Sequence, residues 1–240
     1  MNIESSSRLA DLVTQDSRYA TVLSLYGLDF SCHGDLSLQQ ACAEKSVNFE
    51  TVMAALKALP EQLLARPPFN RFAEWPLGFF VDYINTNHHL YLHKMVPVIQ
   101  AGLEKLARVH GTKHPHLLDC STLYNEVAEN IQQHLWKEEN ILFPYIQTLE
   151  NPRPTAGGSM RLDSAECPIN VMRMEHEREV TDLFRLRELT NSYTAPADGC
   201  ATYCTTYQQL AEFDLDLMQH IHIENNILFP AVLETEQKNR

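Results

Sequence analysis

A sequence pattern that occurs twice, H-x-x-x-E-x-N-I-L-F-P, constrains the fold of this chain more than any other feature. The first copy begins with His134 and Glu138, and the second begins with His220 and Glu224. Residues four apart lie on one face of an α-helix, so each histidine and glutamate can reach the same metal ion or two neighbouring ions. The repeat therefore predicts two helices with metal ligands on corresponding faces.

One further histidine precedes each copy of the repeat at nearly the same distance. His89 lies 45 residues before His134, and His176 lies 44 residues before His220. Residues at equal height in an antiparallel helical hairpin are equally far from its turn, so each pair of histidines fits one hairpin. We therefore expect two hairpins, each with one histidine on its first helix and a His-x-x-x-Glu pair on its second.

The turns of both expected hairpins coincide with helix-breaking residues. The midpoint of the first histidine pair falls at Gly111 and Thr112, and the midpoint of the second falls at Asp198, within residues 196–199, PADG. Glycine and proline are frequent where helices end. The coincidence predicts that six candidate ligands lie in one layer of a four-helix bundle: His89, His134, Glu138, His176, His220 and Glu224.

Hydrophobic periodicity predicts an all-α fold in which the bundle is antiparallel and has four long helices. We expect them over residues 72–109, 116–149, 164–190 and 201–234. Proline lacks the backbone N–H and disrupts a helix interior. We therefore expect a kink at Pro97, and a kink or an early end at Pro144 and Pro230.

A small helical domain is expected before the bundle. Residues 1–66 form this domain and residues 69–240 form the bundle, with a linker that contains Pro67 and Pro68. The small domain is expected to hold helices over residues 10–26, 36–43 and 49–64, the first of them ended by Gly27.

Charge and cysteine content exclude several classes of partner. The formal net charge of -12 argues against nucleic acid, because phosphate binding requires a basic face. No apolar run reaches the roughly 18 residues that span a membrane, and the first residues show no signal-peptide pattern. The six cysteines form no CxxC pair or dense framework. We therefore expect reduced thiols and a cytoplasmic location.

The residue types of the predicted layer suit a two-metal centre. Imidazole and carboxylate ligands together bind iron, manganese or zinc. Two glutamates from opposite sides can bridge two ions, and two histidines on each ion complete the protein ligands. Carboxylate sites in helical bundles commonly hold iron pairs, so we expect two non-haem iron ions with an oxo or hydroxo bridge.

Other histidines near the layer have simpler interpretations. His110 follows His89 by 21 residues, which is ~30 Å along a straight helix, so it is left out of the ligand set. His88 is an alternative to His89, because only one of the two faces the bundle interior. Glu175 is either a support for the neighbouring ligand His176 or a solvated acid. Four histidines are interpreted as surface residues: His33, His114, His116 and His222.

The cysteines divide into one candidate and a set of structural thiols. Cys200 and Cys204 share a helix face and are interpreted as small apolar side chains. Cys32 lies in the turn SCHGD before an expected helix, where helix N-terminal amides would favour a thiolate. Cys32 is therefore either a functional thiol or an ordinary loop cysteine.

These motifs resemble those of the bacterial iron–sulfur cluster repair di-iron proteins, which have a hemerythrin-like bundle. The matching segments are NTNHHLYLHKMVP, HLWKEENILFP, MEHERE and HIHIENNILFP. In that family the positions of the six candidate ligands bind the two irons, and the glutamates bridge them. The amino-terminal segment LYGLDFSCHGD is similar to a family segment that reads F/Y-C-C-G-G. Ser31 and His33 depart from that pattern, so a function that needs two adjacent cysteines is in doubt and a single-thiol role for Cys32 is the alternative.

The resemblance implies repair of iron–sulfur clusters damaged by nitric oxide or peroxide, through iron donation or nitric oxide chemistry. The implied partners are damaged iron–sulfur proteins as clients, nitric oxide or dioxygen as small ligands, and a second copy in a homodimer. Enzymatic reduction of nitric oxide is left open. The alternatives are a hemerythrin-like protein that binds or senses oxygen or nitric oxide without turnover, and a regulatory protein with a structural metal. Oxygen-carrying hemerythrins use five histidines, whereas this layer has four, which favours reactivity or iron release over reversible oxygen binding.

Overall fold

The structure is a computed structural model that describes residues 3–59, 75–150 and 164–239. Internal contacts divide the chain into two compact units. The first comprises Met1–Phe80 together with Met218–Arg240, and the second comprises Val81–Leu217. The fold is all-α, and the described residues contain one isolated β-bridge, between Arg8 and Ser37. The described helices include none that is long and apolar enough to cross a membrane.

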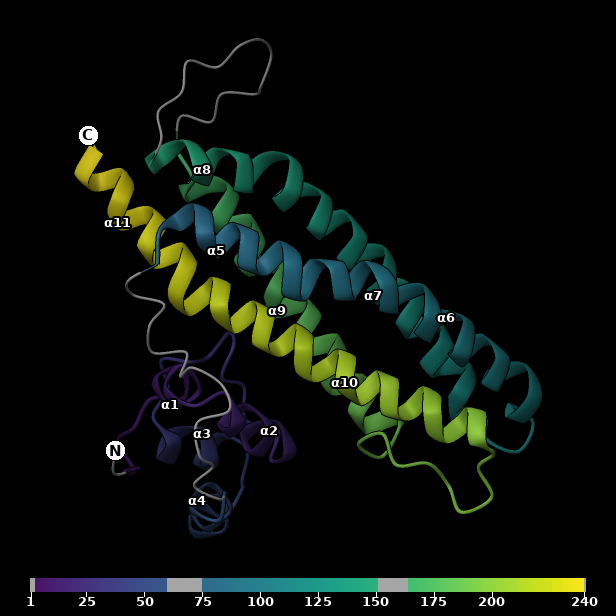
Figure 1. Cartoon of the computed structure of the whole chain (residues 1–240). Coiled ribbons are helices and arrows are strands. Elements are labelled where there is room, and N and C mark those ends of the chain that lie inside the picture. The colour runs from purple at the N-terminus through teal and green to yellow at the C-terminus, as the bar shows by residue number, and fades with distance from the viewer. Residues whose placement is uncertain (1–2, 60–74, 151–163, 240) are drawn as a thin grey trace. The chain divides into compact units, whose positions relative to one another are not determined.

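The second unit contains the body of the predicted four-helix bundle, as Figure 1 shows. Its elements are α6 (Leu90–His110), α7 (His116–Lys137), α8 (Phe143–Glu150), α9 (Glu166–Leu189) and the part of α10 (Ala201–Ile223) that ends at Leu217. Helix α5 (Leu77–Ile84) enters this unit at Val81. Helix α7 packs against both α6 and α9.

Helix α10 packs against all three other long helices of the bundle. A Cβ atom added to Gly102 of α6 would lie 2.8 Å from the Thr206 hydroxyl of α10, so these helices approach closely only because residue 102 is a glycine. The rings of Tyr124 on α7 and Phe213 on α10 have centroids 5.5 Å apart.

A buried ion pair ties α9 to α10. The Arg187 Nε atom donates to Asp214 Oδ2 at 2.6 Å, and the Tyr193 hydroxyl donates to the same carboxylate. Desolvation lowers the pKa of Arg187, but the hydrogen bond and charge of Asp214 outweigh it, so the net pKa is raised. The three polar side chains satisfy one another, as a buried charge requires.

Three of the long helices are interrupted by π-helical segments, which the sequence analysis did not predict. These are η2 (Asn85–His89), η3 (Glu138–Leu142) and η4 (Glu224–Leu228). The backbone N–H groups of Phe143 and Phe229 donate to the carbonyl groups of Glu138 and Glu224, five residues earlier. Pro144 and Pro230 lie two residues after the last residue of these segments, so the wider turn lies where each proline would leave the preceding α-helical turn without a donor.

The predicted effects of the prolines are only partly correct. Helix α6 continues as one α-helix through Pro97 to His110, and the interruption lies earlier, at Asn85–His89. Helix α8 continues six residues past Pro144, and helix α11 (Phe229–Asn239) continues nine residues past Pro230, so neither proline ends its helix. The predicted helix turns agree with the structure, because α6 ends at His110 and α10 begins after residues 196–199.

The first unit holds four short helices, α1 (Leu9–Gln15), α2 (Arg18–Leu25), α3 (Leu38–Glu44) and α4 (Phe49–Lys57). The single helix expected over residues 10–26 is wrong, because Asp16 is extended and separates α1 from α2. The Asp16 carboxylate accepts the Arg18 backbone N–H at 3.0 Å and pairs with the Arg18 side chain, which explains the break. Gly27, with φ +67°, ends the second helix as predicted.

Within the same unit, the loop before α3 packs on the carboxy-terminal segment. The Asn226 side chain donates to the Ser31 carbonyl at 2.9 Å, and a Cβ added to Gly34 would lie 2.8 Å from Asn226 Oδ1. A larger residue at position 34 would have to displace the Asn226 side chain or the backbone of the loop. The predicted end of the α4 helix at Leu64, the linker prolines and the start of the bundle at residue 69 lie outside the described residues.

Candidate metal centre

Three of the predicted ligands meet in the interior of the bundle. His134 lies at the end of α7, Glu138 begins η3, and His176 lies in the middle of α9. The His134 Nε2 atom is 3.2 Å from Glu138 Oε2 and 3.3 Å from His176 Nε2. None of these residues is more than 2% exposed. Two imidazole nitrogens and a carboxylate oxygen therefore converge on one point away from bulk water.

His89 approaches Glu138 from the other side. Its Nε2 atom lies 3.3 Å from Glu138 Oε2, and its ring stacks on Phe143 with centroids 5.3 Å apart. Segment η2 ends at His89, and segment η3 begins at Glu138. A π-helical turn widens the helix by one residue, and such turns are frequent at functional sites. Each of these two side chains therefore lies at the boundary of a widened turn.

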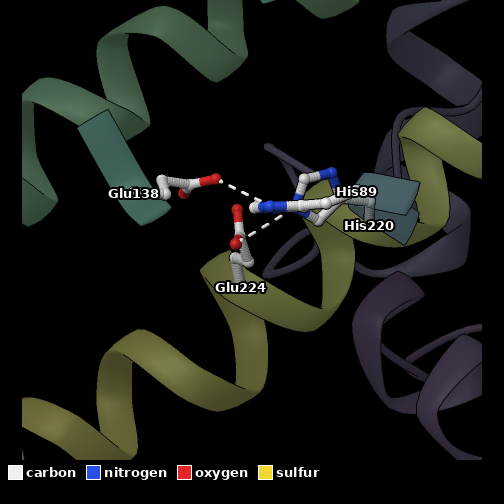
Figure 2. A group of neighbouring side chains, drawn as sticks. All are labelled: His89, Glu138, His220 and Glu224. Atoms are coloured by element: carbon white, nitrogen blue, oxygen red, sulfur yellow. Dashed lines mark ion pairs between the residues drawn. The ribbon is translucent and has the colours of Figure 1, made fainter. Parts of the chain in front are cut away.

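His220 and Glu224 form the second His-x-x-x-Glu pair on one helical face. The His220 Nε2 atom lies 3.1 Å from Glu224 Oε1, and both residues are fully buried. Figure 2 shows this ion pair and the ion pair between His89 and Glu138. The spacing agrees with the prediction that residues four apart share a helical face.

Two groups of four side chains have the geometry to hold a metal ion. The ligand atoms in each group lie within 4.8 Å of one another. The first group contains His89, Glu138, His220 and Glu224, and the second contains His134, Glu138, His176 and Glu224. All six predicted ligands are included, and the two glutamates occur in both groups. Buried imidazole and carboxylate donors of this kind fit iron, manganese or zinc.

Three further carboxylates contact the outer Nδ1 atoms of the candidate ligands. Glu139 Oε1 lies 2.9 Å from His89 Nδ1 and 2.9 Å from His93 Nε2. Glu175 Oε2 lies 3.2 Å from His134 Nδ1, and Glu179 Oε1 lies 3.6 Å from the same atom. From the sequence, Glu175 was either a support for the neighbouring His176 or a solvated acid, and in the structure it contacts His134 instead. Glu139 and Glu179 were not predicted. The i,i+3 spacing of Glu179 from His176 could have revealed it.

The charges around His134 favour a proton on its ring in the absence of metal. Burial lowers the pKa of His134, but Glu138, Glu179 and Glu175 together raise it well above its ordinary value. The pKa of Glu175 is lowered, chiefly by its hydrogen bond from His134 and also by Lys137. A metal ion at Nε2 replaces one proton of this ring, so the same negative surroundings that favour the proton favour a cation.

Comparisons with known proteins agree with this geometry. Residues 83–232 match a family described as the hemerythrin HHE cation binding domain. A repair protein YtfE from Pectobacterium atrosepticum, named for iron–sulfur clusters, is 35% identical over 95% of this chain and 97% of its own length. The chain belongs to the iron–sulfur cluster repair protein family. A homologous protein from Musicola paradisiaca with the same name is 34% identical, and a probable iron–sulfur cluster repair protein from Haemophilus influenzae is 31% identical.

The family match also covers the small domain. Residues 5–60 match ScdA_N, described as a domain of unknown function. The Musicola relative covers 95% of this chain and 96% of its own length, so the likeness is not confined to the bundle. The hemerythrin HHE domain implies a metal-binding site in this member of the repair family.

The Cys32 loop of this repair-family member is ordered by an aspartate and by the carboxy-terminal segment. The Asp29 carboxylate accepts the backbone N–H groups of Ser31 and Cys32, each at 3.0 Å. The Asn225 side-chain amide donates to Cys32 Sγ at 3.7 Å, and Asn225 directly follows Glu224. Cys32 lies in a turn before a helix, as expected, but α3 begins only at Leu38 with Ser37 as its N-cap, six residues after Cys32.

Three of the four histidines assigned to the surface, His114, His116 and His222, are not exposed. His222 is buried, with Nε2 3.2 Å from the Thr14 hydroxyl, and burial lowers its pKa to about 4. His116 is half-buried, with Nε2 3.2 Å from the hydroxyl groups of Tyr203 and Tyr207. The helices that carry His116 and His222, α7 and α10, are each covered on a second face. Hydrophobic periodicity identifies only the main buried face of a helix and does not reveal the second. His33 is largely exposed and pairs with Asp29, as expected of a surface residue.

The structure separates the remaining alternatives. His88 Nδ1 lies 3.2 Å from Asp216 Oδ1, and His88 belongs to neither group of candidate ligands. His110 ends α6, where its Nε2 atom lies 3.4 Å from Cys200 Sγ. This geometry agrees with the choice of His89 and with the exclusion of His110.

Proposed function

We propose that this chain binds two non-haem iron ions and uses them to repair damaged iron–sulfur clusters. The observation that supports the pair of ions is that Glu138 and Glu224 occur in both groups of ligand atoms. A carboxylate has two oxygens, so each glutamate can contribute one oxygen to each ion. In this arrangement His89 and His220 would bind one ion, and His134 and His176 would bind the other.

The protein residues around these ions would supply orientation and exclusion of water. The six candidate ligands are almost completely buried, which keeps the centre out of bulk solvent. Glu139 and Glu175 accept hydrogen bonds from the outer Nδ1–H groups of His89 and His134, and so hold Nε2 toward the ions. Iron bound there would supply redox chemistry and positions for a small ligand such as nitric oxide or dioxygen.

The names of the relatives support repair over reversible oxygen binding. Proteins 31%, 34% and 35% identical to this chain are named for iron–sulfur cluster repair. Four imidazoles for two ions leave ligand positions for exchange, which suits release of iron to a client. The clients that we propose are iron–sulfur proteins whose clusters have been damaged by nitric oxide or peroxide.

The Cys32 thiol is the proposed functional thiol of the small domain. Asn225, which directly follows the candidate ligand Glu224, donates a hydrogen bond to the thiol. A thiol at this position could accept iron or react with a nitric oxide product, and Ser31 in place of a neighbouring cysteine restricts it to a single-thiol role.

The experiment that tests the proposal is recovery of a damaged iron–sulfur enzyme. A purified enzyme with a nitric oxide-damaged cluster would be incubated anaerobically with the iron-loaded chain, the metal-free chain, or the iron-loaded Glu129→Ala and Glu138→Ala variants. Glu129 is exposed on α7 and serves as the matched control. We expect recovery with the loaded wild type and Glu129→Ala alone. Equal recovery with the metal-free chain would reject the function, and a stable reversible oxygen adduct without recovery would favour an oxygen-binding protein.

A further inference from the structure

Glu179 is a buried carboxylate for which the proposed ligand set has no role. It lies on α9, three residues after His176, and is 3% exposed. Neither of its carboxylate oxygens has a hydrogen-bond partner among the described residues. The Nδ1 atom of His134 lies 3.6 Å from Glu179 Oε1. A buried carboxyl group in this position needs a physical reason.

The burial of Glu179 costs free energy unless a nearby positive charge offsets it. An isolated carboxylate is strongly disfavoured in a protein interior. The buried charged side chains of the described residues include no lysine or arginine. A positive charge that can offset Glu179 is therefore one on His134 beside it, or one on a cation that His134 binds.

The orientation of His134 shows which role Glu179 can have. The Nε2 atom of His134 faces Glu138 and His176, whereas Nδ1 faces Glu175 and Glu179. Glu179 therefore lies behind the ring and outside both groups of candidate ligands. From there its negative charge can favour a proton at Nδ1 and leave Nε2 available, but it cannot replace Nε2 as a ligand.

Glu175 shares this position and is less suited to hold the ring alone. The Glu175 side chain is 29% exposed and also pairs with Lys137 at the surface. Glu179 is buried, so solvent and salt screen its charge much less. His89, a candidate ligand of the other ion, has the partly exposed Glu139 at 2.9 Å from its Nδ1 atom. These distances therefore place a buried carboxylate behind His134 in addition to a partly exposed one.

We propose that Glu179 is a positioning residue that orients His134 and stabilises the positive charge of the metal bound to it. The proposal depends on the proposed iron centre, and it goes further by giving Glu179 a role at one of the two ions. With Glu179 in place, the ion at His134 and His176 is held more tightly and favours its more oxidised state more than it would without this carboxylate. Residues that support a ligand in this way commonly change metal affinity by about 10- to 100-fold when they are replaced.

The test compares Glu179→Gln and Glu179→Leu with Glu177→Gln in the iron-loaded full chain. Glutamine matches glutamate in shape and removes the charge, and leucine would satisfy a packing role. Glu177 lies two residues away on the same helix and is exposed, so its replacement removes the same charge from solvent. The measurements are the iron dissociation constant by chelator competition, the midpoint potential, and the thermal stability of each metal-free protein.

We expect both Glu179 variants to lose iron affinity by about 10- to 100-fold at one site and to shift the midpoint potential upward. The metal-free Glu179→Leu protein should be at least as stable as the wild type, because a buried carboxyl group has been removed. Glu177→Gln should match the wild type in all three measurements. If Glu179→Leu retains wild-type affinity and potential, the positioning role is rejected while the iron centre stands. If the wild type itself fails to bind two irons, the proposed function is rejected instead.

Discussion

The Nε2 atoms of His134 and His176 lie 3.3 Å apart, although the two residues come from different helices of the bundle. Two nitrogen ligands bound at about 2.1 Å to one ion, with a bond angle of roughly 90–110°, lie about 3.0–3.4 Å apart. The protein therefore holds these two rings at the separation that a shared metal ion requires.

Replacement of either proposed bridging residue should abolish the iron pair. Glu138→Ala and Glu224→Ala each remove a carboxylate that occurs in both groups of ligand atoms. We expect at most one iron per chain and no magnetic coupling between irons, measured by metal analysis and Mössbauer spectroscopy. Glu129→Ala is the control for loss of an α7 glutamate. Two coupled irons in Glu138→Ala or Glu224→Ala would refute the bridging role of that residue.

His110→Ala should leave the iron content unchanged. His110 ends α6, and its contacts are Cys200 and the ring of Tyr203 at a centroid distance of 5.8 Å. His89 is the last residue of η2 and directly precedes α6, so His89→Ala is the matched variant that should lose iron. Metal analysis of both purified variants is sufficient, and a clear loss of iron in His110→Ala would show that a second ligand environment has been overlooked.

Cys32→Ser should preserve the iron centre and weaken repair. The thiol is held by Asn225 and is not among the ligand groups, so the iron spectra should match the wild type. Recovery of a damaged iron–sulfur enzyme should slow at least several-fold, and Cys167→Ser, at an exposed position, should not affect it. Recovery at the wild-type rate would make Cys32 an ordinary loop thiol.

Thiol labelling at pH 8 should divide the cysteines by burial. Burial raises the pKa of Cys120 to about 12, above the pH of the experiment, so its thiol stays protonated and unreactive. Exposed Cys167, Cys200 and Cys204 should react with iodoacetamide within minutes, and Cys120 should react only after denaturation.

The raised pKa of the buried Cys120 thiol also predicts a loss of stability at alkaline pH. The unfolded thiol ionises near its ordinary pKa of 9.0, whereas the folded thiol holds its proton until about 12. The stabilisation is therefore complete below pH 9 and is lost as pH rises from 9 to 12. Cys120→Ala should reduce this loss in urea unfolding, relative to each protein's own stability at pH 8. An unchanged pH dependence would contradict the burial argument.

The sequence predicted the ligand layer because two kinds of signal were independent. The spacing of His89, His134, His176 and His220 gave the heights of the ligands, and helix-breaking residues gave the turns. The structure places all six predicted ligands in the two candidate metal groups. Their assignment as iron ligands is still a proposal.

Features that depend on tertiary packing or on single side-chain hydrogen bonds could not be predicted from hydrophobic periodicity. The π-helical segments add one residue per turn, a change too small to alter a hydrophobic pattern. His222 was assigned to the surface because a helical wheel has no information about a second covered face, here the contact with Thr14. Asp16 divides the first predicted helix through a side-chain hydrogen bond, and that competition is local and specific.

Metal analysis with Mössbauer spectroscopy of the anaerobically purified wild type tests the central claim most directly. The proposed centre predicts two irons per chain and the spectrum of an antiferromagnetically coupled pair. One iron per chain, zinc in place of iron, or two uncoupled irons would contradict it, and the proposed repair function would then lose the structural observation that supports it.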